Sequence, residues 1–532
     1  MISFIVALLV LVVGYLTYGK FVSHEFGADP QRQTPCYTDN DGIDFIPMPT
    51  WKVYMIQFLN IAGLGPIFGA IMGAKFGTAS YLWIVLGTIF AGAVHDYLGA
   101  MISLRMKGAS LPEIIGFFLG RRARALMGIF ISVLMILVAA VFISGPAELL
   151  GGMTAGWGMD SYKWIGIIFI YYIIATLCPV DKIIGRVYPF FAFCLIFMAI
   201  GILGYLLIMQ PALPELWESD FFVNKSWEKN AVFPMMFISI ACGAISGFHA
   251  TQSPLMARCI KSEAMGRRCF YGAMVTEGVV ALIWAAAATC FFQENGVVNE
   301  ATGKAFTGAY VASTVCNNWL GVVGGILATL GIAVAPITTG DTALRSGRLI
   351  IADFFKVEQQ QMKKRLLIAI PMFILTSVVL LWSIEDKNGF NILWRYFAWC
   401  NQALSVFTLW AITVYLLREK KRWWITFIPA VFMTCVCSSY ILVAPEGFAM
   451  DTRLGVSISA IVSVFISVST LVGHFRHVKQ NFFPDSTRPQ FMVHVWMPEG
   501  SFLYETDKRV QAVAEAARKL DGVTGVSTVL ED

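Results

Sequence analysis

The chain has 532 residues, of which 57% are hydrophobic and only 14% are charged. A soluble protein has about 25% charged residues, so an assembly of soluble domains is excluded and one integral membrane body is expected. The net charge of +5 does not indicate nucleic-acid binding, because the basic residues lie in short loops between apolar segments.

Thirteen apolar segments are long enough to cross a hydrocarbon core of about 30 Å as helices, which predicts an all-α polytopic membrane protein. The first segment has no basic residues before it and no small-residue cleavage site after it, so we expect a retained helix rather than a signal peptide. The predicted spans are residues 2–18, 53–73, 80–104, 125–147, 163–180, 187–209, 231–251, 271–292, 309–336, 366–384, 392–417, 424–444 and 454–473.

Lysine and arginine are concentrated in every second loop from the third span onward. These loops are residues 105–124, 182–186, 258–268, 345–365 and 418–422, whereas the intervening loops hold few basic residues. Positively charged loops stay in the cytoplasm, so the alternation predicts an N-terminus outside and a C-terminus inside.

The end of the chain has a different pattern. Residues 491–497 and 525–530 have the alternation of strands, and residues 506–520 have helical spacing. We predict a small cytoplasmic β-α-β module over residues 485–532. A stabilising role and a regulatory role are both open for it.

Two apolar segments are interrupted by glycine and proline. The first contains the sequence GLGP at residues 63–66, and the second contains ACGAISGFHATQSP at residues 241–254. Glycine weakens a helix and proline removes an N–H donor, so backbone groups near these points lose their helical partners. Such groups persist at membrane depth only where they line a cavity or face other protein. For each break alone, a proline kink with close packing of small residues is the alternative, and the glycines spaced by four at positions 65, 69, 73 and 77 fit such a ridge.

The positions of the two breaks predict the architecture. Five spans over residues 53–209 start with the first break, and five spans over residues 231–417 start with the second. An odd number of spans places the second half upside down, and broken helices at matching positions of inverted halves are typical of secondary transporters. The N-terminal helix and loop (residues 1–52) and two peripheral helices (residues 424–473) complete the membrane body.

We expect the substrate to bind between the breaks, near the middle of the membrane. Helix N-termini offer N–H groups to an anion and free carbonyl groups can hold a cation, so a substrate carboxylate is expected near one break. The candidate substrate-binding residues are Asn60, Gly63, Gly65, Ser246, Gly247, His249 and Gln252.

Ionisable residues inside the spans are the candidates for ion coupling, because a charge at membrane depth costs about 2.5–3.5 kcal/mol. Glu277 has no charged residue within one helical turn, and His95 and Asp96 lie together in span 80–104. A buried carboxyl group beside imidazoles that titrate near neutral pH favours coupling to protons. Asp96 could instead pair with a cytoplasmic arginine.

A further polar cluster follows span 309–336 and leaves sodium open as the coupling ion. Thr338, Thr339, Asp341 and Thr342 could supply hydroxyl and carboxylate oxygens for Na⁺. The same residues could simply form a helix end. Arg395, near the outer end of span 392–417, is a functional candidate as an ionisable residue inside a span, or it could extend its side chain to the membrane surface.

Enzyme and sensor functions are less favoured alternatives. His95, Asp96, His249 and Glu277 could form an acid–base or metal site, but no motif places two metal ligands on one helix face. Most of the eleven cysteines lie in apolar stretches, so we expect no metal and no cofactor. The 44 residues from position 489 onward are too few for a catalytic signalling domain.

Several runs of the sequence closely resemble the carbon starvation protein A family. They are DGIDFIP at residues 41–47, GAVHD at 92–96, IACGAISGFHATQSPLMARC at 240–259, TGDTALR at 339–345 and WRYFAWCNQ at 394–402. The resemblance implies a multi-pass transporter of the bacterial cytoplasmic (inner) membrane with a fold like that of the leucine transporter. It also implies uptake of peptides in the response to carbon starvation, and some relatives take up pyruvate with protons. The chain differs from longer family members in having fewer C-terminal spans.

Together these observations predict a secondary active transporter for short peptides that is driven by protons, with a pyruvate/proton symporter as the alternative. Glu277, with His95 and Asp96, would carry the proton. The amine of a peptide needs an acceptor, for which Asp96 or Glu277 is available. The expected partners are this small carboxylate-bearing substrate and the lipid bilayer, and a homo-oligomer is open.

Overall fold

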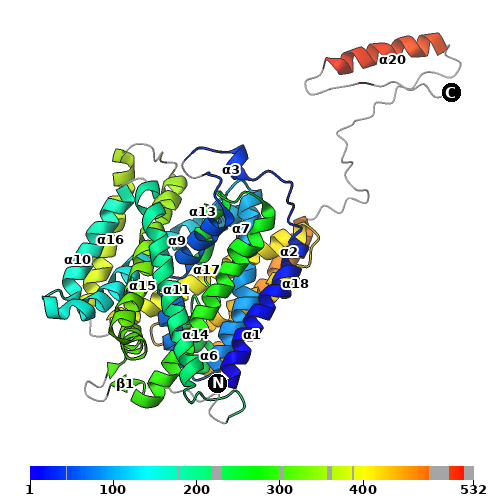
Figure 1. The fold of residues 1–532 in the computed structure, drawn as a ribbon. Coiled ribbons are helices and arrows are strands. Elements are labelled where there is room, and N and C mark those ends of the chain that lie inside the picture. The colour runs from blue at the N-terminus through cyan, green and yellow to red at the C-terminus, as the bar shows by residue number, and fades with distance from the viewer. Residues whose placement is uncertain are drawn as a thin grey trace. The chain divides into compact units, whose positions relative to one another are not determined.

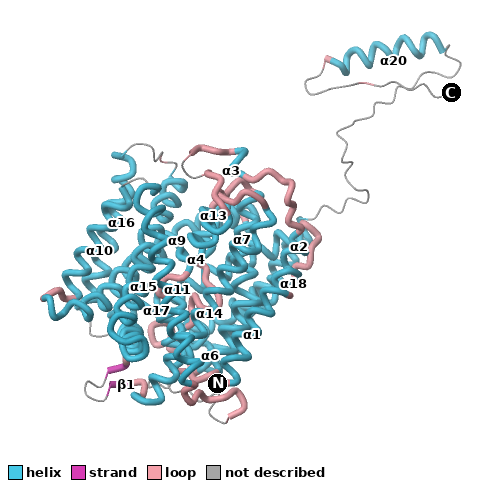
Figure 2. Tube along the Cα trace, viewed as in Figure 1, coloured by secondary structure: helices cyan, strands magenta, loops and turns pink. Residues whose placement is uncertain are grey.

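The computed structural model describes residues 1–42, 45–177, 180–218, 231–299, 304–355, 357, 362–385, 389–477, 503–519 and 526. The chain forms two units, Met1–His474 and Phe475–Asp532. Helices dominate the described residues, as Figure 2 shows by colour. The expected helical, multi-span membrane body is therefore confirmed.

The first unit is a bundle of helices that run back and forth between two ends (Figure 1). Up to the first uncertain loop the elements are α1 (Ile2–Leu16), α2 (Tyr18–Phe26), α3 (Pro35–Thr38), α4 (Thr50–Ile61), η1 (Gly65–Gly69), α5 (Ala70–Ala74), α6 (Ala79–Gly87), η2 (Thr88–Gly92), α7 (Ala93–Arg105), α8 (Leu111–Leu119), α9 (Arg121–Thr154), η3 (Ala155–Trp157), α10 (Ser161–Leu177) and α11 (Val180–Met209).

The bundle continues after that loop. Its elements are α12 (Val232–Ser239), α13 (His249–Ala257), η5 (Glu263–Met265), η6 (Arg267–Tyr271), α14 (Gly272–Asn295), the paired strands β1 (Val298–Asn299) and β2 (Lys304–Ala305), α15 (Gly308–Phe355), α16 (Met362–Glu385), α17 (Gly389–Arg418), α18 (Trp424–Val443) and α19 (Thr452–His477). Elements η1, η2 and η6 are single π-helical turns.

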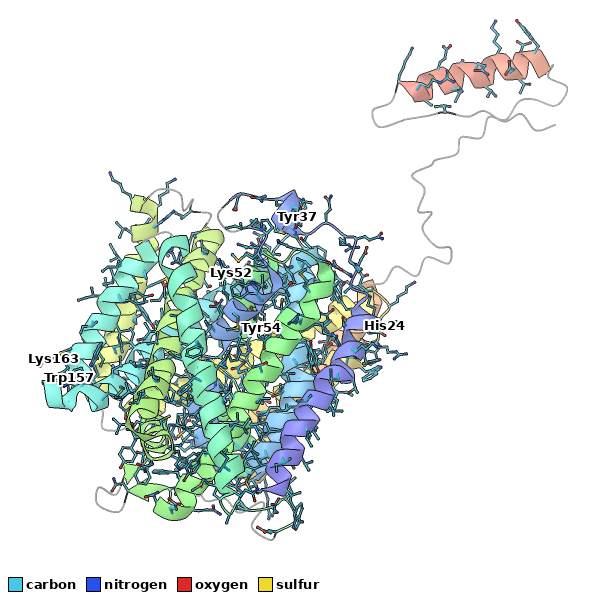
Figure 3. The ribbon with its side chains drawn as sticks, viewed as in Figure 1. His24, Tyr37, Lys52, Tyr54, Trp157 and Lys163 are labelled. Atoms are coloured by element: carbon cyan, nitrogen blue, oxygen red, sulfur yellow. The ribbon has the colours of Figure 1, made fainter. Side chains whose placement is uncertain are left out.

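We name the two ends of the bundle by landmarks. The Met1 end holds Met1 and the β1–β2 hairpin, and the α3 end holds α3 (Figure 1). Figure 3 shows the side chains of His24, Tyr37 and Lys52 toward the α3 end.

Nine helices of the described residues are long and apolar enough to cross a membrane, or ten if the bent pair of α4 with η1 and α5 counts as one. Two further predicted spans correspond to shorter apolar stretches at Ser161–Ala175 and Phe193–Met209, and span 231–251 is divided between α12 and α13. Outer helices expose large apolar side chains, such as Ile461 and Phe465 of α19, which are about 70% exposed. Such a surface suits lipid rather than water.

One predicted helix end is wrong. Span 309–336 was expected to finish before the polar cluster at Thr338–Thr342, but α15 runs on to Phe355 with a single non-helical residue at Gly321. The helix accommodates the cluster because Thr338 and Thr339 each donate a hydroxyl hydrogen bond to the carbonyl group of Ala335, one turn earlier. Pro336 lies inside this helix, where it has no N–H group to donate to the preceding turn, and the Tyr172 hydroxyl donates to the Pro336 carbonyl group at 3.3 Å.

The second unit contains α20 (Leu503–Arg518), which matches the helix expected at residues 506–520. The strand expected at 491–497 lies outside the described residues, as does the strand at 525–530 apart from residue 526.

Candidate functional site

At both predicted interruptions the helix is broken while the chain continues. The first separates α4 from η1 at residues 62–64 and bends the segment by 53°. The second is longer, because residues 240–248 between α12 and α13 are not helical. Glycines lie in both breaks, as their low helix preference predicts, whereas Pro254, which was expected to be part of the second interruption, lies inside α13.

The two broken helices are antiparallel and meet at their breaks, a region that we call the crossing. Helix α4 packs on α13 and α5 packs on α12, and Met48 N–H donates to the Cys259 carbonyl group at 3.1 Å at the α3 end. Three glycines of the predicted ridge allow this approach. A Cβ atom on Gly65 would overlap Cys242, one on Gly73 would overlap Ile240, and one on Gly69 would lie 3.1 Å from the Ser239 carbonyl oxygen.

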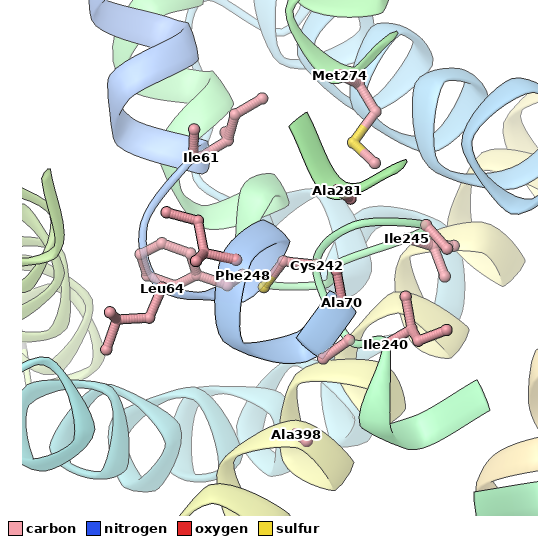
Figure 4. Close-up of a cluster of buried hydrophobic side chains, with 14 of the residues drawn as sticks. Ile61, Leu64, Ala70, Ile240, Cys242, Ile245, Phe248, Met274, Ala281 and Ala398 are labelled. Atoms are coloured by element: carbon pink, nitrogen blue, oxygen red, sulfur yellow. The ribbon is translucent and has the colours of Figure 1, made fainter. Parts of the chain in front are cut away.

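Figure 4 shows the crossing at close range, with Leu64 of the first break near Phe248 and with Ala70 near Cys242 of the second. These apolar side chains are almost completely buried. The crossing is therefore packed, and its backbone groups need partners inside the protein.

Two amide side chains of α17 supply most of those partners. Asn401 Oδ1 accepts hydrogen bonds from the Phe248 N–H at 2.7 Å and from the Ser246 hydroxyl at 3.0 Å, and the Asn401 carbonyl accepts from Gly247 N–H at 3.1 Å. Gln402 Nε2 donates to the Ala241 carbonyl at 2.8 Å. The N–H groups next to α13 that were expected to bind a substrate carboxylate are thus occupied by Asn401.

A buried network of two carboxylates and two imidazoles lies beside the second break. Asp96 Oδ1 is 2.8 Å from His95 Nδ1, and Asp96 Oδ2 is 2.8 Å from His249 Nδ1. His249 Nε2 is 3.4 Å from Glu277 Oε2. The four side chains come from α7, α13 and α14, and none is more than 1% exposed. We call this set the carboxylate–imidazole network.

The charge of this network depends on the protons that it holds. With both carboxylates ionised and both imidazoles neutral it would carry two negative charges, and two added protons would make it neutral. Buried net charge is costly, so the neutral, two-proton state is favoured at membrane depth. Within the part of the chain that the structure describes, neither oxygen of Glu277 receives a hydrogen bond. The Nε2 atoms of His95 and His249 likewise have no hydrogen-bond partner among the described residues.

The other predicted site residues divide between the crossing and more distant positions. Thr339 lies at the first break, where its hydroxyl donates to the Leu59 carbonyl group at 3.1 Å and lies close to Gly63. Asn60 and Gln252 are buried, and the side-chain carbonyl oxygen of each accepts no hydrogen bond within the described residues.

Asp341 and Thr342, two of the sodium candidates, have partners within α15. Asp341 Oδ2 lies 3.8 Å from Arg345 on the next turn of α15, and the Thr342 hydroxyl donates to the Thr339 carbonyl at 2.9 Å. Among the described residues, no group of three or more His, Cys, Asp or Glu side chains could hold a metal ion.

Sequence reasoning missed the residues that hold the second break in place. Asn401, Gln402 and Thr88, whose hydroxyl donates to the Gly243 carbonyl at 3.0 Å, are all buried. The available signal was the Asn-Gln pair in the largely apolar span 392–417. The π-helical turns η2 and η6, which precede α7 and α14, had no sequence signal, although such turns are frequent at functional sites.

The sequence of this chain is similar to the sequences of known transporters. The chain is 23% identical to the peptide transporter CstA of Escherichia coli K12 over 84% of this chain and 81% of that protein. It is 25% identical to the pyruvate/proton symporter BtsT of the same organism over 81% of this chain and 80% of that protein. These relatives are transporters and not enzymes.

The crystal structure of the Eremococcus coleocola manganese transporter has a similar fold. The TM-score is 0.50 at 14% sequence identity, over 82% of this chain and 99% of the other.

The family match covers most of the membrane unit. Residues 1–159, 150–325 and 292–439 match the family described as carbon starvation protein CstA. The chain therefore belongs to the carbon starvation protein CstA family.

Proposed function

We propose that this protein is a secondary active transporter that imports short peptides across a bacterial cytoplasmic membrane together with protons. Its similarity to a peptide transporter over most of both chains supports the substrate class. The carboxylate–imidazole network supports protons as the coupling ion. It joins the second broken helix to α7 and α14 through His249, which is the observation that carries the proposal.

The topology that we propose is two inverted halves at residues 53–209 and 231–417, with the α3 end in the cytoplasm. The antiparallel contact of the two broken helices supports the inversion. Basic side chains gathered at the α3 end support the orientation. There Arg105 donates to the Gly27 carbonyl at 2.7 Å, Lys421 to the Glu25 carbonyl at 3.1 Å and Arg258 to the Gly108 carbonyl at 3.0 Å.

Transport then requires the broken helices to move against α17. The segments 53–104 and 231–292 would rock together, and the bonds from Asn401 and Gln402 to residues 240–248 would change as they do so. A substrate carboxylate can replace Asn401 as the acceptor for the N–H groups of Gly247 and Phe248. The amine of a peptide would then face Glu277 or Asp96.

Proton binding follows from the same geometry. When Glu277 is protonated it can donate to His249 Nε2, because His249 Nδ1 faces Asp96. Movement of α13 would separate His249 from Glu277 and release that proton to the other side of the membrane.

A pyruvate/proton symporter is the second candidate function. The similarity to a protein of that name over most of both chains favours it. Pyruvate would need only the carboxylate partner and no acceptor for an amine.

Uptake into proteoliposomes tests the proposal. We expect the purified protein to take up a labelled dipeptide, pyruvate or both when an inward proton gradient is imposed. We also expect it to prefer the dipeptide. Glu277→Gln should remove the dependence of uptake on the gradient, because the amide cannot bind or release the proton. Glu294→Gln, an exposed residue of the same helix, is the matched control and should leave it unchanged. Uptake that ignores the gradient in the wild type would contradict proton coupling.

A further inference from the structure

A second polar site lies at the Met1 end, away from the carboxylate–imidazole network. It is a pocket of about 70 Å³ whose walls come from the ends of α5 and α12, from β2, from α17 and from the segment after α18. Among the described residues, its charged lining residues are Lys75, Arg395 and Glu446. These two cations and one carboxylate sum to one positive charge, and a positive charge attracts an anion.

The charged groups of this pocket have partners but differ in exposure, because Lys75 and Glu446 are largely buried whereas the Arg395 side chain is 32% exposed. Lys75 is 4% exposed and its ammonium group donates to the Phe306 carbonyl at 3.2 Å. Arg395 Nε lies 3.4 Å from Glu446 Oε1, which also accepts the hydroxyl hydrogen bond of Tyr440. The other carboxylate oxygen of Glu446 is buried and accepts no hydrogen bond within the described part of the chain.

The pocket adjoins the crossing. Ser239, the last residue of α12, and Ala398 of α17 both line it. Residues 240–248 follow Ser239 directly, and Asn401 lies one helical turn beyond Ala398, which is about 4.5 Å along the axis.

Aromatic rings in edge-to-face contact lead from the pocket to the crossing. Trp394, which lines the pocket, lies 5.4 Å from the Phe397 ring, which lies 5.8 Å from Phe142. Phe142 in turn lies 6.4 Å from Phe248 of the second break. These apolar rings, which we call the barrier, thus connect Trp394 at the pocket with Phe248 at the crossing.

We infer that this pocket is an entry site where Arg395 and Lys75 capture the carboxylate group of the incoming substrate. The inference rests on the proposed function, in which the Met1 end faces outward and the substrate carries a carboxylate. Arg395 forms its ion pair with Glu446 when the pocket is empty and exchanges it for the substrate carboxylate. A volume of about 70 Å³ admits a carboxylate group but no complete peptide, so the rest of the peptide stays in the mouth of the pocket until the barrier opens.

Saturation curves for uptake of a dipeptide and of its C-terminal amide test this inference. The wild type should prefer the free acid at least tenfold in KM. Arg395→Gln should raise the KM for the acid about tenfold and leave that for the amide unchanged, because only the acid loses a charged partner. Arg395→Lys should keep part of the preference.

Two further variants make the result specific. Arg453→Gln removes an exposed arginine in the first turn of α19 that does not line the pocket, and it should leave both KM values unchanged. Glu446→Gln should lower the KM for the acid, since Arg395 no longer has a competing carboxylate. This variant also provides a test should Arg395→Gln fail to fold.

The outcomes separate this inference from the function itself. Equal changes in KM for acid and amide would show a purely structural role for Arg395 and overturn the inference, while leaving proton-driven uptake intact. No uptake of dipeptide or pyruvate by the wild type would overturn the proposed function.

Discussion

The two breaks of the crossing differ in length and in what holds them. Residues 62–64 form a short bend, next to which the Thr339 hydroxyl donates to the Leu59 carbonyl. Residues 240–248 form a longer segment with bonds from Asn401, Gln402 and Thr88, and they lead into His249 of the network. The first break is therefore held mainly by packing, whereas the second combines backbone groups that are bonded to side chains with a neighbouring ionisable network. This difference predicts that equivalent changes at the two breaks have unequal effects.

Glycine substitutions should show the largest contrast. A Cβ atom on Gly247 would overlap the Asn401 carbonyl oxygen and the Ser405 backbone nitrogen, which cannot move away cheaply. We expect Gly247→Ala to destabilise the protein by about 3 kcal/mol and to abolish uptake. In Gly63→Ala the new atom lies 3.1 Å from the Phe142 ring, which can shift, so we expect a loss of about 1 kcal/mol. Thermal unfolding in detergent, with uptake alongside, measures both, and equal losses would contradict the comparison.

Removing the side-chain partners of the two breaks should give an intermediate effect. Asn401→Ala leaves the buried N–H group of Phe248 without its acceptor, at a cost of about 2 kcal/mol. Thr339→Val at the first break removes one hydroxyl bond to Leu59 and should cost about 1 kcal/mol. The same unfolding measurement checks the order. A Thr339→Val protein less stable than Asn401→Ala would place the more important support at the first break.

The smallest effect is expected at Thr342, in the cluster considered for sodium. Its hydroxyl donates within its own helix, so Thr342→Val should change stability by no more than about 0.5 kcal/mol. Uptake by this variant and by the wild type should be unchanged when choline replaces sodium. A loss of uptake without sodium would favour Na⁺ as the coupling ion.

The breaks and part of the network could be predicted because they depend on local properties of the sequence. Glycine and proline weaken a helix wherever they occur, and Glu277 is conspicuous as a lone carboxylate in an apolar span. The contact of Asp96 with His249 joins residues 153 positions apart and depends on how α7 packs on α13. No local pattern contains that information.

Two other features were hidden for different physical reasons. Asn401 carries no charge, so it did not stand out as an ionisable residue would, although it bonds to three groups of the second break. The continuation of α15 through Pro336 runs against the local preference, because proline favours a helix end and α15 nevertheless extends from Gly308 to Phe355.

The central claim is that substrate moves together with a proton bound at Glu277. It is tested most directly by trapping a pH-sensitive dye inside proteoliposomes and adding dipeptide outside with no imposed gradient. The account predicts that dipeptide acidifies the interior for the wild type and for Glu294→Gln, but not for Glu277→Gln. Dipeptide uptake by the wild type without acidification, or acidification that persists in Glu277→Gln, would contradict it.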